Sequence, residues 1–273
     1  MTVGEAIRAA AEALAPESDT ARLDAELLMA HLFGVTRSEL LLRHMRDPSP
    51  PGFAALVERR AGHEPVAYIT GRQEFYGLPF IVTPATLIPR GDSETLVAAA
   101  LEAKPDAGRV LDLGTGSGAL LLAVLAYLRQ AHGVGIDRSP EAVAVAVRNA
   151  EQLGLRPQAM FREGDWLAPG WADDLGTFDL ILCNPPYVES DAALDPQVRD
   201  FEPATALFAG PEGLDDYRVL IPQLRALMNP QALAVLEIGA NQAEAVGALA
   251  AASGFATALR RDLAGRARAL LLS

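Results

Sequence analysis

The first part of the chain shows the hydrophobic spacing of amphipathic helices. Apolar residues recur there at intervals that place them on one helical face, namely Leu23, Leu27, Leu28 and Leu32. The pattern stops at the proline-rich segment 47–52 and resumes as a short helix over residues 53–60. We therefore expect a small, all-helical domain over residues 1–62.

Between Tyr68 and Leu87 this pattern gives way to glycine, proline, aromatic and β-branched residues. Such a composition, with glycines between short apolar runs, is typical of a β-hairpin. We assign residues 63–90 to a linker that contains the hairpin.

Short apolar runs alternate with helical patterns over residues 91–273. The runs predict strands at 110–113, 133–136, 159–162, 178–183, 232–238 and 267–272. The patterns between the first of them predict helices at 94–103, 119–128 and 140–153. Strands that alternate with helices at this interval imply right-handed crossovers and a mostly parallel sheet. The predicted fold class is therefore α/β.

Size and composition agree with two folded cores in a reducing compartment. The chain has 273 residues, of which 50% are hydrophobic. The single cysteine, Cys183, has no disulfide partner, and the four histidines lack the paired spacing of zinc ligands, so we expect no metal. We see no secretion signal and no uncharged apolar run near the ~20 residues that span a bilayer. We expect a cytoplasmic monomer that does not engage membranes.

The charge balance bears on the partner. A formal net charge of −12 is unlike that of proteins that grip phosphate backbones. The nearest approach to a basic patch consists of Arg260, Arg261, Arg266 and Arg268. This group is more typical of a solvated strand end or turn. We therefore expect no stable binding of nucleic acid.

A glycine-rich turn joins the first strand of the sheet to the next helix. Its residues are Asp112, Gly114, Thr115, Gly116, Ser117 and Gly118. Glycines at such a turn permit positive φ and let a ligand lie against the backbone at a helix N-terminus, where the dipole favours a carboxylate. The Gly-x-Gly-x-Gly pattern behind an acidic strand residue resembles the first motif of class I methyltransferases, whose cofactor S-adenosylmethionine has such a carboxylate. Asp112 is then expected near its amino group.

Two further positions extend the predicted cofactor site. Asp137 closes the next strand, where an acid accepts hydrogen bonds from both ribose hydroxyls. This spacing fits a dinucleotide equally, and only the glycine pattern favours S-adenosylmethionine. Asp165 and Trp166 follow the third strand, where the indole can stack on adenine or simply belong to the core.

The fourth strand ends in Asn184, Pro185, Pro186 and Tyr187. An amide nitrogen is a poor nucleophile because its lone pair is delocalised. If the Asn184 side-chain oxygen and the Pro185 carbonyl each accept one N–H, the NH₂ group is held with its lone pair toward the methyl donor. Tyr187 offers a flat surface for the acceptor. The alternative is a rigid turn in which Asn184 caps its own backbone, and Cys183 is expected to be a buried thiol rather than a nucleophile.

Nearly the whole chain resembles the HemK-type (PrmC) protein-glutamine methyltransferases, which modify the glutamine of the Gly-Gly-Gln loop in peptide-chain release factors. Matching segments are 21–28, Arg59-Arg60, Glu64-Pro65, 68–71, 74–77, 87–90, 112–118, 184–187 and 201–203. The resemblance implies a Rossmann-like seven-stranded sheet, a helical N-terminal domain that helps receive the release factor, and S-adenosylmethionine as cofactor.

By position, the resemblance implies that residues 114–118, Asp137, Trp166 and Asn184 contact the cofactor and that residues 184–187 hold the acceptor. The chain departs from the family at Gly91, where proline is usual, and at Ser93, where threonine is common. The departure leaves the roles of Arg90 and Glu94 open between a mutual salt bridge and a substrate contact.

The main alternative function is methylation of an adenine amino group in rRNA or DNA. A flipped base presents the same NH₂ geometry to Asn-Pro-Pro-Tyr. The acidic charge balance favours a protein acceptor instead. A non-catalytic protein that binds S-adenosylmethionine is disfavoured by the intact glycines and Asn184. We expect the loop from Val188 to Leu214 to overlie the acceptor.

Overall fold

The computed structural model describes all residues, 1–273. The chain divides into two compact units. One comprises residues 1–72 and 194–201, and the other comprises 73–193 and 202–273. Each unit has hydrophobic core residues of its own.

The first unit is helical, which confirms the predicted helical N-terminal region. Its elements are α1 (Val3–Leu14), α2 (Ala21–Phe33), α3 (Arg37–Glu39), the π-helical turn η1 (Leu40–His44), α4 (Phe53–Ala61), α5 (Val66–Thr70) and α9 (Pro196–Arg199). Leu28, Met29 and Leu40 are fully buried in its core. Helix α5 occupies residues that we assigned to the linker, because a five-residue helix is too short to leave a periodic signal.

The second unit contains the remaining elements. Its strands are β1 (Arg72–Phe75), β2 (Leu78–Ile81), β3 (Arg109–Leu113), β4 (His132–Asp137), β5 (Ala159–Glu163), β6 (Phe178–Cys183), β7 (Met228–Glu237), β8 (Thr257–Arg261) and β9 (Ala267–Leu272). Its helices are α6 (Glu94–Ala103), α7 (Ala119–Tyr127), α8 (Pro140–Gln152), α10 (Asp215–Leu224) and α11 (Ala243–Ala252), with 3₁₀ turns η2 (Gly91–Ser93), η3 (Ala204–Ala206) and η4 (Arg225–Leu227). Strands β1 and β2 form the predicted hairpin.

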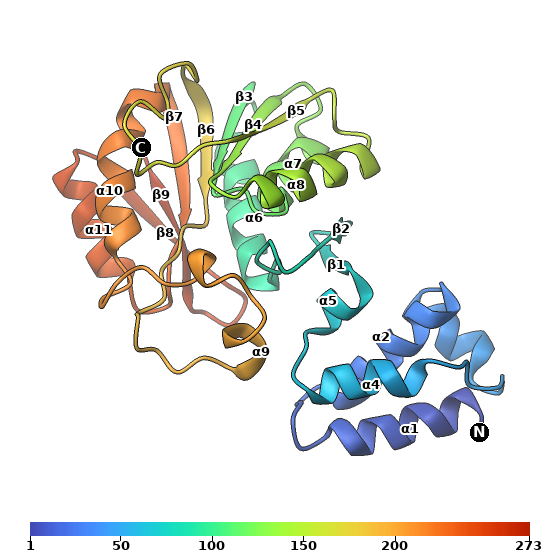
Figure 1. Cartoon of the computed structure of the whole chain (residues 1–273). Helices are drawn as coiled ribbons and strands as arrows, with labels where there is room; N and C mark the ends of the chain where they lie inside the picture. The colour runs from blue at the N-terminus through green and yellow to red at the C-terminus, as the bar shows by residue number, and fades with distance from the viewer. The chain divides into compact units, whose positions relative to one another are not determined.

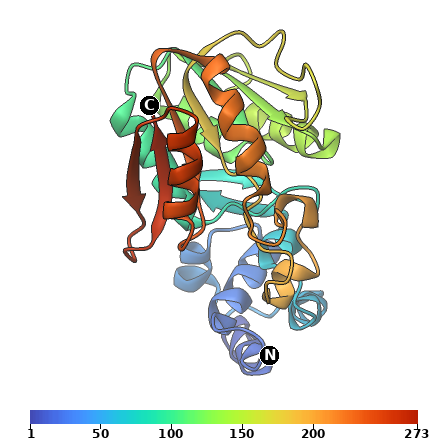
Figure 2. The same ribbon diagram turned by 90° about the vertical axis from the view of Figure 1, so that its left-hand side faces the viewer.

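Seven strands form the main sheet in the order β5-β4-β3-β6-β7-β9-β8. Strands β3 to β7 pair in parallel, and β9 pairs antiparallel with both β7 and β8. This confirms a mostly parallel seven-stranded sheet. The edge strand β8 was missed, because its residues are half-buried or exposed and lack the apolar run of the other strands (Figure 2).

Alternate residues of the central strands serve opposite faces of the sheet. Val110, Leu180 and Leu182 pack in the same core as α6, α7 and α8. Leu111 and Ile181 pack with α10 and α11 on the other face, as expected of a sheet covered by helices on both sides (Figure 1). None of the helices is both long and apolar enough to cross a membrane.

Two of the four arginines in the candidate basic patch, Arg266 and Arg268, form ion pairs. Arg266 and Arg268 each place an Nη2 2.9 Å from Oδ2 of Asp92, and Arg266 Nε lies 2.8 Å from Oδ2 of Asp262. These pairs join the β8–β9 hairpin to η2. Arg260 and Arg261 end β8 and Arg266 lies in the connection to β9, as expected of a solvated strand end or turn. Arg268 departs from this expectation, since it lies within β9 and is buried.

The core of the first unit encloses an ion pair. Arg60 Nε donates to Asp24 Oδ2 at 2.7 Å, and both side chains are less than a tenth exposed. The hydroxyls of Ser18 and Thr20 also donate to Asp24, at 2.8 and 2.9 Å. Removal of the arginine would leave a buried carboxylate without its counter-charge.

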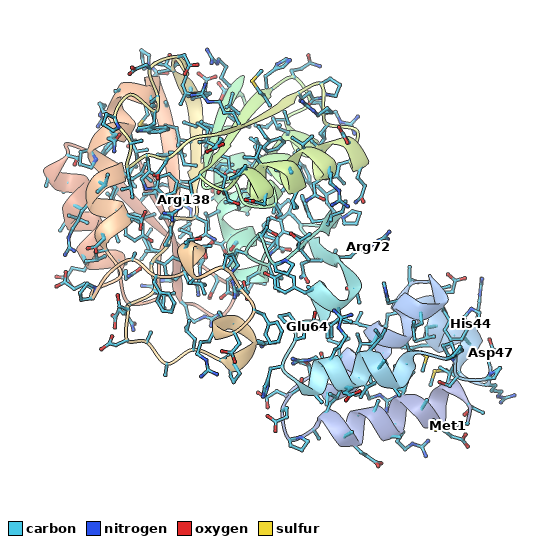
Figure 3. The ribbon with its side chains drawn as sticks, viewed as in Figure 1. Met1, His44, Asp47, Glu64, Arg72 and Arg138 are labelled. Atoms are coloured by element: carbon cyan, nitrogen blue, oxygen red, sulfur yellow. The ribbon has the colours of Figure 1, made fainter.

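We expect Arg60→Met to lower the free energy of unfolding of the first unit by about 3–5 kcal/mol, the cost of breaking a buried pair. The neighbouring Arg59 pairs with Glu64, labelled in Figure 3, but its side chain is 45% exposed. Arg59→Met should therefore cost less than about 1 kcal/mol. Urea unfolding followed by circular dichroism measures both; equal losses would contradict the prediction.

Candidate functional site

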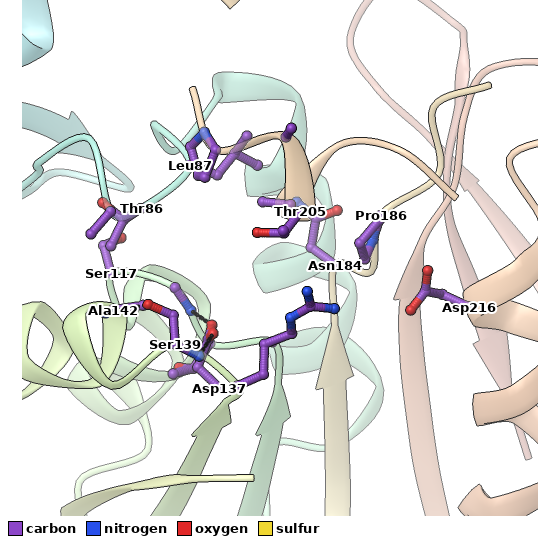
Figure 4. A pocket seen from close by; sticks show the side chains of 18 of the residues that line it. Thr86, Leu87, Ser117, Asp137, Ser139, Ala142, Asn184, Pro186, Thr205 and Asp216 are labelled. Atoms are coloured by element: carbon purple, nitrogen blue, oxygen red, sulfur yellow. Dashed lines mark hydrogen bonds between the residues drawn. The ribbon is translucent and has the colours of Figure 1, made fainter. Parts of the chain in front are cut away.

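A cavity of about 800 Å³ opens at the carboxyl ends of β3, β4 and β6. The strand order reverses between β3 and β6, and ligands of open α/β sheets bind at such a point. Eight of the predicted site residues line the cavity, several of them visible in Figure 4: Gly114, Thr115, Gly116, Ser117, Asp137, Trp166, Asn184 and Pro186.

Five predicted site residues do not line this cavity: Asp112, Gly118, Asp165, Pro185 and Tyr187. Gly118 precedes α7 with φ +81°, and a Cβ there would press against Ala146 and Phe161. Asp165 instead stabilises a turn, since its Oδ1 accepts the backbone N–H of Leu167 at 2.9 Å. A direct ligand contact by these residues stays a prediction.

The glycine-rich turn uses most of its own backbone N–H groups. Gly114 and Thr115 both donate to the Ile136 carbonyl at 2.9 Å, and Gly118 donates to that of Thr115 at 2.8 Å. Gly116 has φ +54° and no atom within 4 Å of the position of a Cβ. The turn therefore presents a close backbone wall and the dipole of α7 to a ligand, rather than a row of free donors.

Asn149 of α8 joins this turn to the β1–β2 hairpin. Its Oδ1 accepts the N–H of Ile81 at 2.7 Å, and its Nδ2 donates to the carbonyls of Ile81 and Ser117 at 3.0 and 2.8 Å. The side chain is fully buried. Asn149 was not predicted as a site residue, because an asparagine inside a helical pattern carries no sign of its distant partners.

Asp112 lies behind the turn with an unsatisfied oxygen. Thr115 Oγ1 donates to its Oδ2 at 2.6 Å, whereas Oδ1 is buried without a hydrogen-bond partner. Burial raises the pKa of Asp112 to about 7, against the opposing effect of the Thr115 hydrogen bond.

Asp137 stands at the end of β4 and lines the cavity (Figure 4). Its Oδ2 accepts the N–H of Gly116 at 2.8 Å, and its Oδ1 accepts that of Ser139 at 3.0 Å. Burial raises its pKa, and these hydrogen bonds and the charge of Arg138 oppose the rise. Each oxygen retains a lone pair for a further donor.

Trp166 packs against the glycine turn. Its ring lies 3.2 Å from the position of a Cβ on Gly114, and its Nε1 donates to Asp216 Oδ1 at 3.0 Å. Asp216, which the sequence analysis missed, lines the cavity on the opposite side of Asn184 and Pro186 from Asp137 (Figure 4). The indole is thus held in a fixed orientation at the wall.

Asn184 stands next to the glycine turn. The pairing of Leu113 with Cys183 brings the two strand ends together, and the Asn184 carbonyl oxygen lies 3.9 Å from a Cβ position on Gly114. The hydroxyl of Tyr187 donates to Glu237 Oε1 at 3.1 Å, and burial raises the pKa of Tyr187. Cys183 is buried, as predicted, and burial raises its pKa well above the ordinary value. A thiol held in its neutral form is a weak nucleophile, which agrees with the expectation of a structural residue.

A clamp outside the predicted set joins two walls of the cavity. Glu202 accepts from Arg90 Nη2 at 2.7 Å and from the Ile88 N–H at 3.2 Å. Arg90 and Glu94 do not pair with each other, so the first of the two alternatives for these residues is wrong. Glu94 accepts the N–H of Tyr76 instead, at 2.8 Å. Residues on both sides of this clamp line the cavity: Thr86, Leu87, Pro89, Pro203, Ala204, Thr205 and Ala206. In the sequence, these residues were marked only by the segments 87–90 and 201–203, which match the family.

The sheet order, the glycine turn after β3 and the polar end of β6 together define a class I methyltransferase. Residues 5–71 match the PrmC N-terminal domain, and residues 104–221 match a methyltransferase domain. The release factor glutamine methyltransferase of Rhodospirillum rubrum is 43% identical over 257 residues, which cover 92% of this chain and 78% of the relative. That of Cereibacter sphaeroides is 43% identical over 276 residues, 98% and 97% of the two chains. The chain belongs to the release factor glutamine methyltransferase family.

Solved structures agree on the fold. The hMettl16 catalytic domain in complex with the MAT2A 3′UTR hairpin 6 matches with a TM-score of 0.57 and 15% identity over 82% of this chain and 93% of that one. A methyltransferase from Pyrococcus furiosus matches with a TM-score of 0.51 and 14% identity, over 80% and 96%. At these identities the likeness extends to the fold alone.

The raised pKa of Asp112 predicts a pH-dependent stability. Because the folded state holds this proton more tightly than the unfolded state, the free energy of unfolding falls as pH rises from about 4 to about 7. Asp112→Asn removes the titrating carboxyl and with it this pH dependence. The stability of the variant relative to the native chain should therefore be higher at pH 7.5 than at pH 5, by about 2 kcal/mol.

Denaturant titration at the two pH values measures this difference. Asp179→Asn is the matched control, because hydrogen bonds lower the pKa of Asp179 despite its partial burial, so it stays ionised across the range. If the difference in free energy of unfolding between Asp112→Asn and the native chain is the same at both pH values, Asp112 does not titrate in this range.

Proposed function

We propose that this chain transfers a methyl group from S-adenosylmethionine to the side-chain amide nitrogen of a glutamine, that of the Gly-Gly-Gln loop of a peptide-chain release factor. Membership of a family whose relatives are named for this activity supports the acceptor. The observation that carries the proposal is the shared cavity: Asn184 and the glycine turn line the same space of about 800 Å³. This volume suits a small-molecule site.

The residues present fit S-adenosylmethionine. The open backbone at Gly116 would admit its methionine portion, and the Asp112 carboxyl behind this turn would lie near its ammonium group. The free lone pairs of Asp137 suit ribose hydroxyls, and the fixed indole of Trp166 suits adenine. The bound cofactor supplies an electrophilic methyl group on sulfur. We include Thr115, Ser117, Gly118 and Asp165 in the same proposed site.

Asn184 and Pro185 would orient the acceptor. The Asn184 side-chain oxygen and the Pro185 carbonyl each accept one N–H of the glutamine amide, which directs the nitrogen lone pair at the methyl group. Such positioning supplies up to about 7–11 kcal/mol of barrier reduction. The two oxygens also stabilise the positive charge that develops on nitrogen. Pro186 and the ring of Tyr187 complete the surface, and the helical N-terminal domain receives the release factor.

One experiment tests the acceptor. Methyl-labelled S-adenosylmethionine is supplied with release factor, tRNA, rRNA or DNA in separate reactions. We expect label on the release factor, and none on a release factor in which the loop glutamine is replaced by alanine. Label on RNA or DNA alone would show that the acceptor is a base amino group.

Asn184→Ala should lose most methyl transfer while its cofactor affinity stays within about tenfold, because one acceptor for the nucleophile is gone. Single-turnover transfer and calorimetric titration measure the two quantities. Asn229→Ala is the control, since Asn229 lies at the start of β7 and bonds Asp179, away from the cavity. Unchanged turnover in Asn184→Ala would contradict the proposal that Asn184 orients the acceptor amide.

Asp137→Ala should weaken S-adenosylmethionine binding by at least about tenfold, because hydrogen bonds to a charged group are lost. Calorimetric titration measures the affinity. Asp174→Ala serves as control, since Asp174 is exposed and pairs only with Arg162. An unaltered dissociation constant in Asp137→Ala would remove this residue from the site.

A further inference from the structure

The segment that follows β7 holds Tyr187 at both its side chain and its main chain. The Tyr187 hydroxyl donates to Glu237 Oε1 at 3.1 Å. Its carbonyl oxygen accepts from Gln242 Nε2 at 3.0 Å. Glu237 and Gln242 lie five residues apart at the end of β7 and just before α11. One short segment therefore fixes the last residue of Asn-Pro-Pro-Tyr from two directions.

Gln242 uses its whole amide group in this contact. Besides the Tyr187 carbonyl, Nε2 donates to the Gly213 carbonyl at 3.1 Å, and Oε1 accepts the N–H of Gly239 at 2.9 Å. Glutamate lacks the two donors, and methionine of similar length lacks every one of these groups. Gly213 has φ +65°, and a Cβ there would collide with the Tyr187 carbonyl oxygen. The contact thus requires both an amide at 242 and a bare backbone at 213.

Glu237 is itself held in place. It is 3% exposed, and its carbonyl accepts the hydroxyl of the fully buried Tyr217 at 2.6 Å. It follows Leu236, which pairs with Cys183 in the sheet, so its carboxylate stands beside the end of β6. A rigid strand therefore carries the group that receives the Tyr187 hydroxyl.

Asn-Pro-Pro-Tyr depends on such anchors for a simple reason. Pro185 and Pro186 have no N–H, so the segment cannot fix itself with its own backbone donors after β6 ends. At one end it is fixed by the β6 ladder at Cys183. Its other end is held at Tyr187 by Glu237 and Gln242, and just beyond it by backbone hydrogen bonds of Val188 with Leu207 and Ala209, at 2.8 and 2.9 Å.

We propose that Glu237 and Gln242 are positioning residues, which set the direction in which Asn184 and the Pro185 carbonyl face the acceptor nitrogen. They act through Tyr187 and touch neither cofactor nor acceptor. The inference rests on the proposed function, because it assigns these residues to the amide clamp of that reaction. Misplacement of a reacting group by about 1 Å costs about 100-fold in rate.

Gln242→Met tests the main-chain anchor. We expect the rate of single-turnover methyl transfer at saturating cofactor and release factor to fall about 10- to 100-fold, with cofactor affinity within about threefold of the native value. Gln242→Glu keeps an oxygen that can accept the N–H of Gly239 but loses both N–H donors of the amide, so its rate should fall as well. Gln152→Met is the matched control. Gln152 donates to the Pro79 carbonyl at 2.8 Å from the C-terminal end of α8 and does not line the cavity, so this variant should leave the rate unchanged.

A pair of variants tests the side-chain anchor. Tyr187→Phe and Glu237→Leu remove the same hydrogen bond, so the double variant should be no slower than the slower single variant. Melting temperatures of all variants are measured alongside. A purely structural role would lower the melting temperature and the fraction of active enzyme, but not the rate per active site, counted by bound cofactor.

Asn184→Ala in the same assay separates the role of Asn184 in holding the acceptor from the positioning role of Glu237 and Gln242. If that variant transfers at the native rate, Asn184 does not orient the acceptor and the positioning role of Glu237 and Gln242 fails with it. The proposed function fails only if the native chain puts no label on the release factor. If Asn184→Ala is slow while Gln242→Met and Gln242→Glu stay within twofold of the native rate per active site, the positioning role alone is overturned.

Discussion

Parallel hydrogen bonding between β3 and β6 places two loops at one edge of the sheet, although they lie about 70 residues apart in the chain. The register that pairs Leu113 with Cys183 makes Gly114 and Asn184 neighbours. Because the strand order reverses between these two strands, a crevice opens there instead of a continuous helix layer. A slip of one residue in this register would turn the strand faces over and move Asn184 away from the glycine turn. The cavity, and every contact assigned to it, follows from this one pairing.

Most polar groups around the cavity are satisfied within the protein. Amides of the glycine turn bond Ile136 and Asp137, Trp166 bonds Asp216, and Glu202 holds Arg90. The site therefore has its shape before any ligand arrives, which limits the reorganisation that binding requires. Two buried oxygens are exceptions, Asp112 Oδ1 and Glu237 Oε2. The first lies behind the turn proposed to hold the cofactor, and the second behind the residue that ends the acceptor clamp.

The proline pair illustrates how one local property places a demand on distant parts of the chain. Residues without N–H groups leave their carbonyls free, which suits a site that must accept hydrogen bonds from an amide. The same lack deprives the segment of its own means of fixation. Strand β7, the neighbour of β6, supplies what is missing: the carboxylate of its last residue, Glu237, and the amide of Gln242 in the segment that follows both bond Tyr187. Stiffness of the acceptor site is thus a property of two adjacent strands.

The amino-acid sequence by itself determined the alternation of strands and helices, the position of the glycine turn and the tetrapeptide at the end of β6. These features are local, since burial on one or both faces imposes a period that can be read along the chain. Strand β8 was not predicted, because an edge strand needs little burial. Helix α5 was not predicted, because it is too short to show a period. Tertiary structure alone decided that Arg90 pairs with Glu202, 112 residues away, and that Trp166 faces the cavity while its neighbour Asp165 stabilises a turn. It also decided that Gln242 reaches Tyr187. Such contacts leave no local pattern, because they depend on which strands become neighbours when the sheet closes.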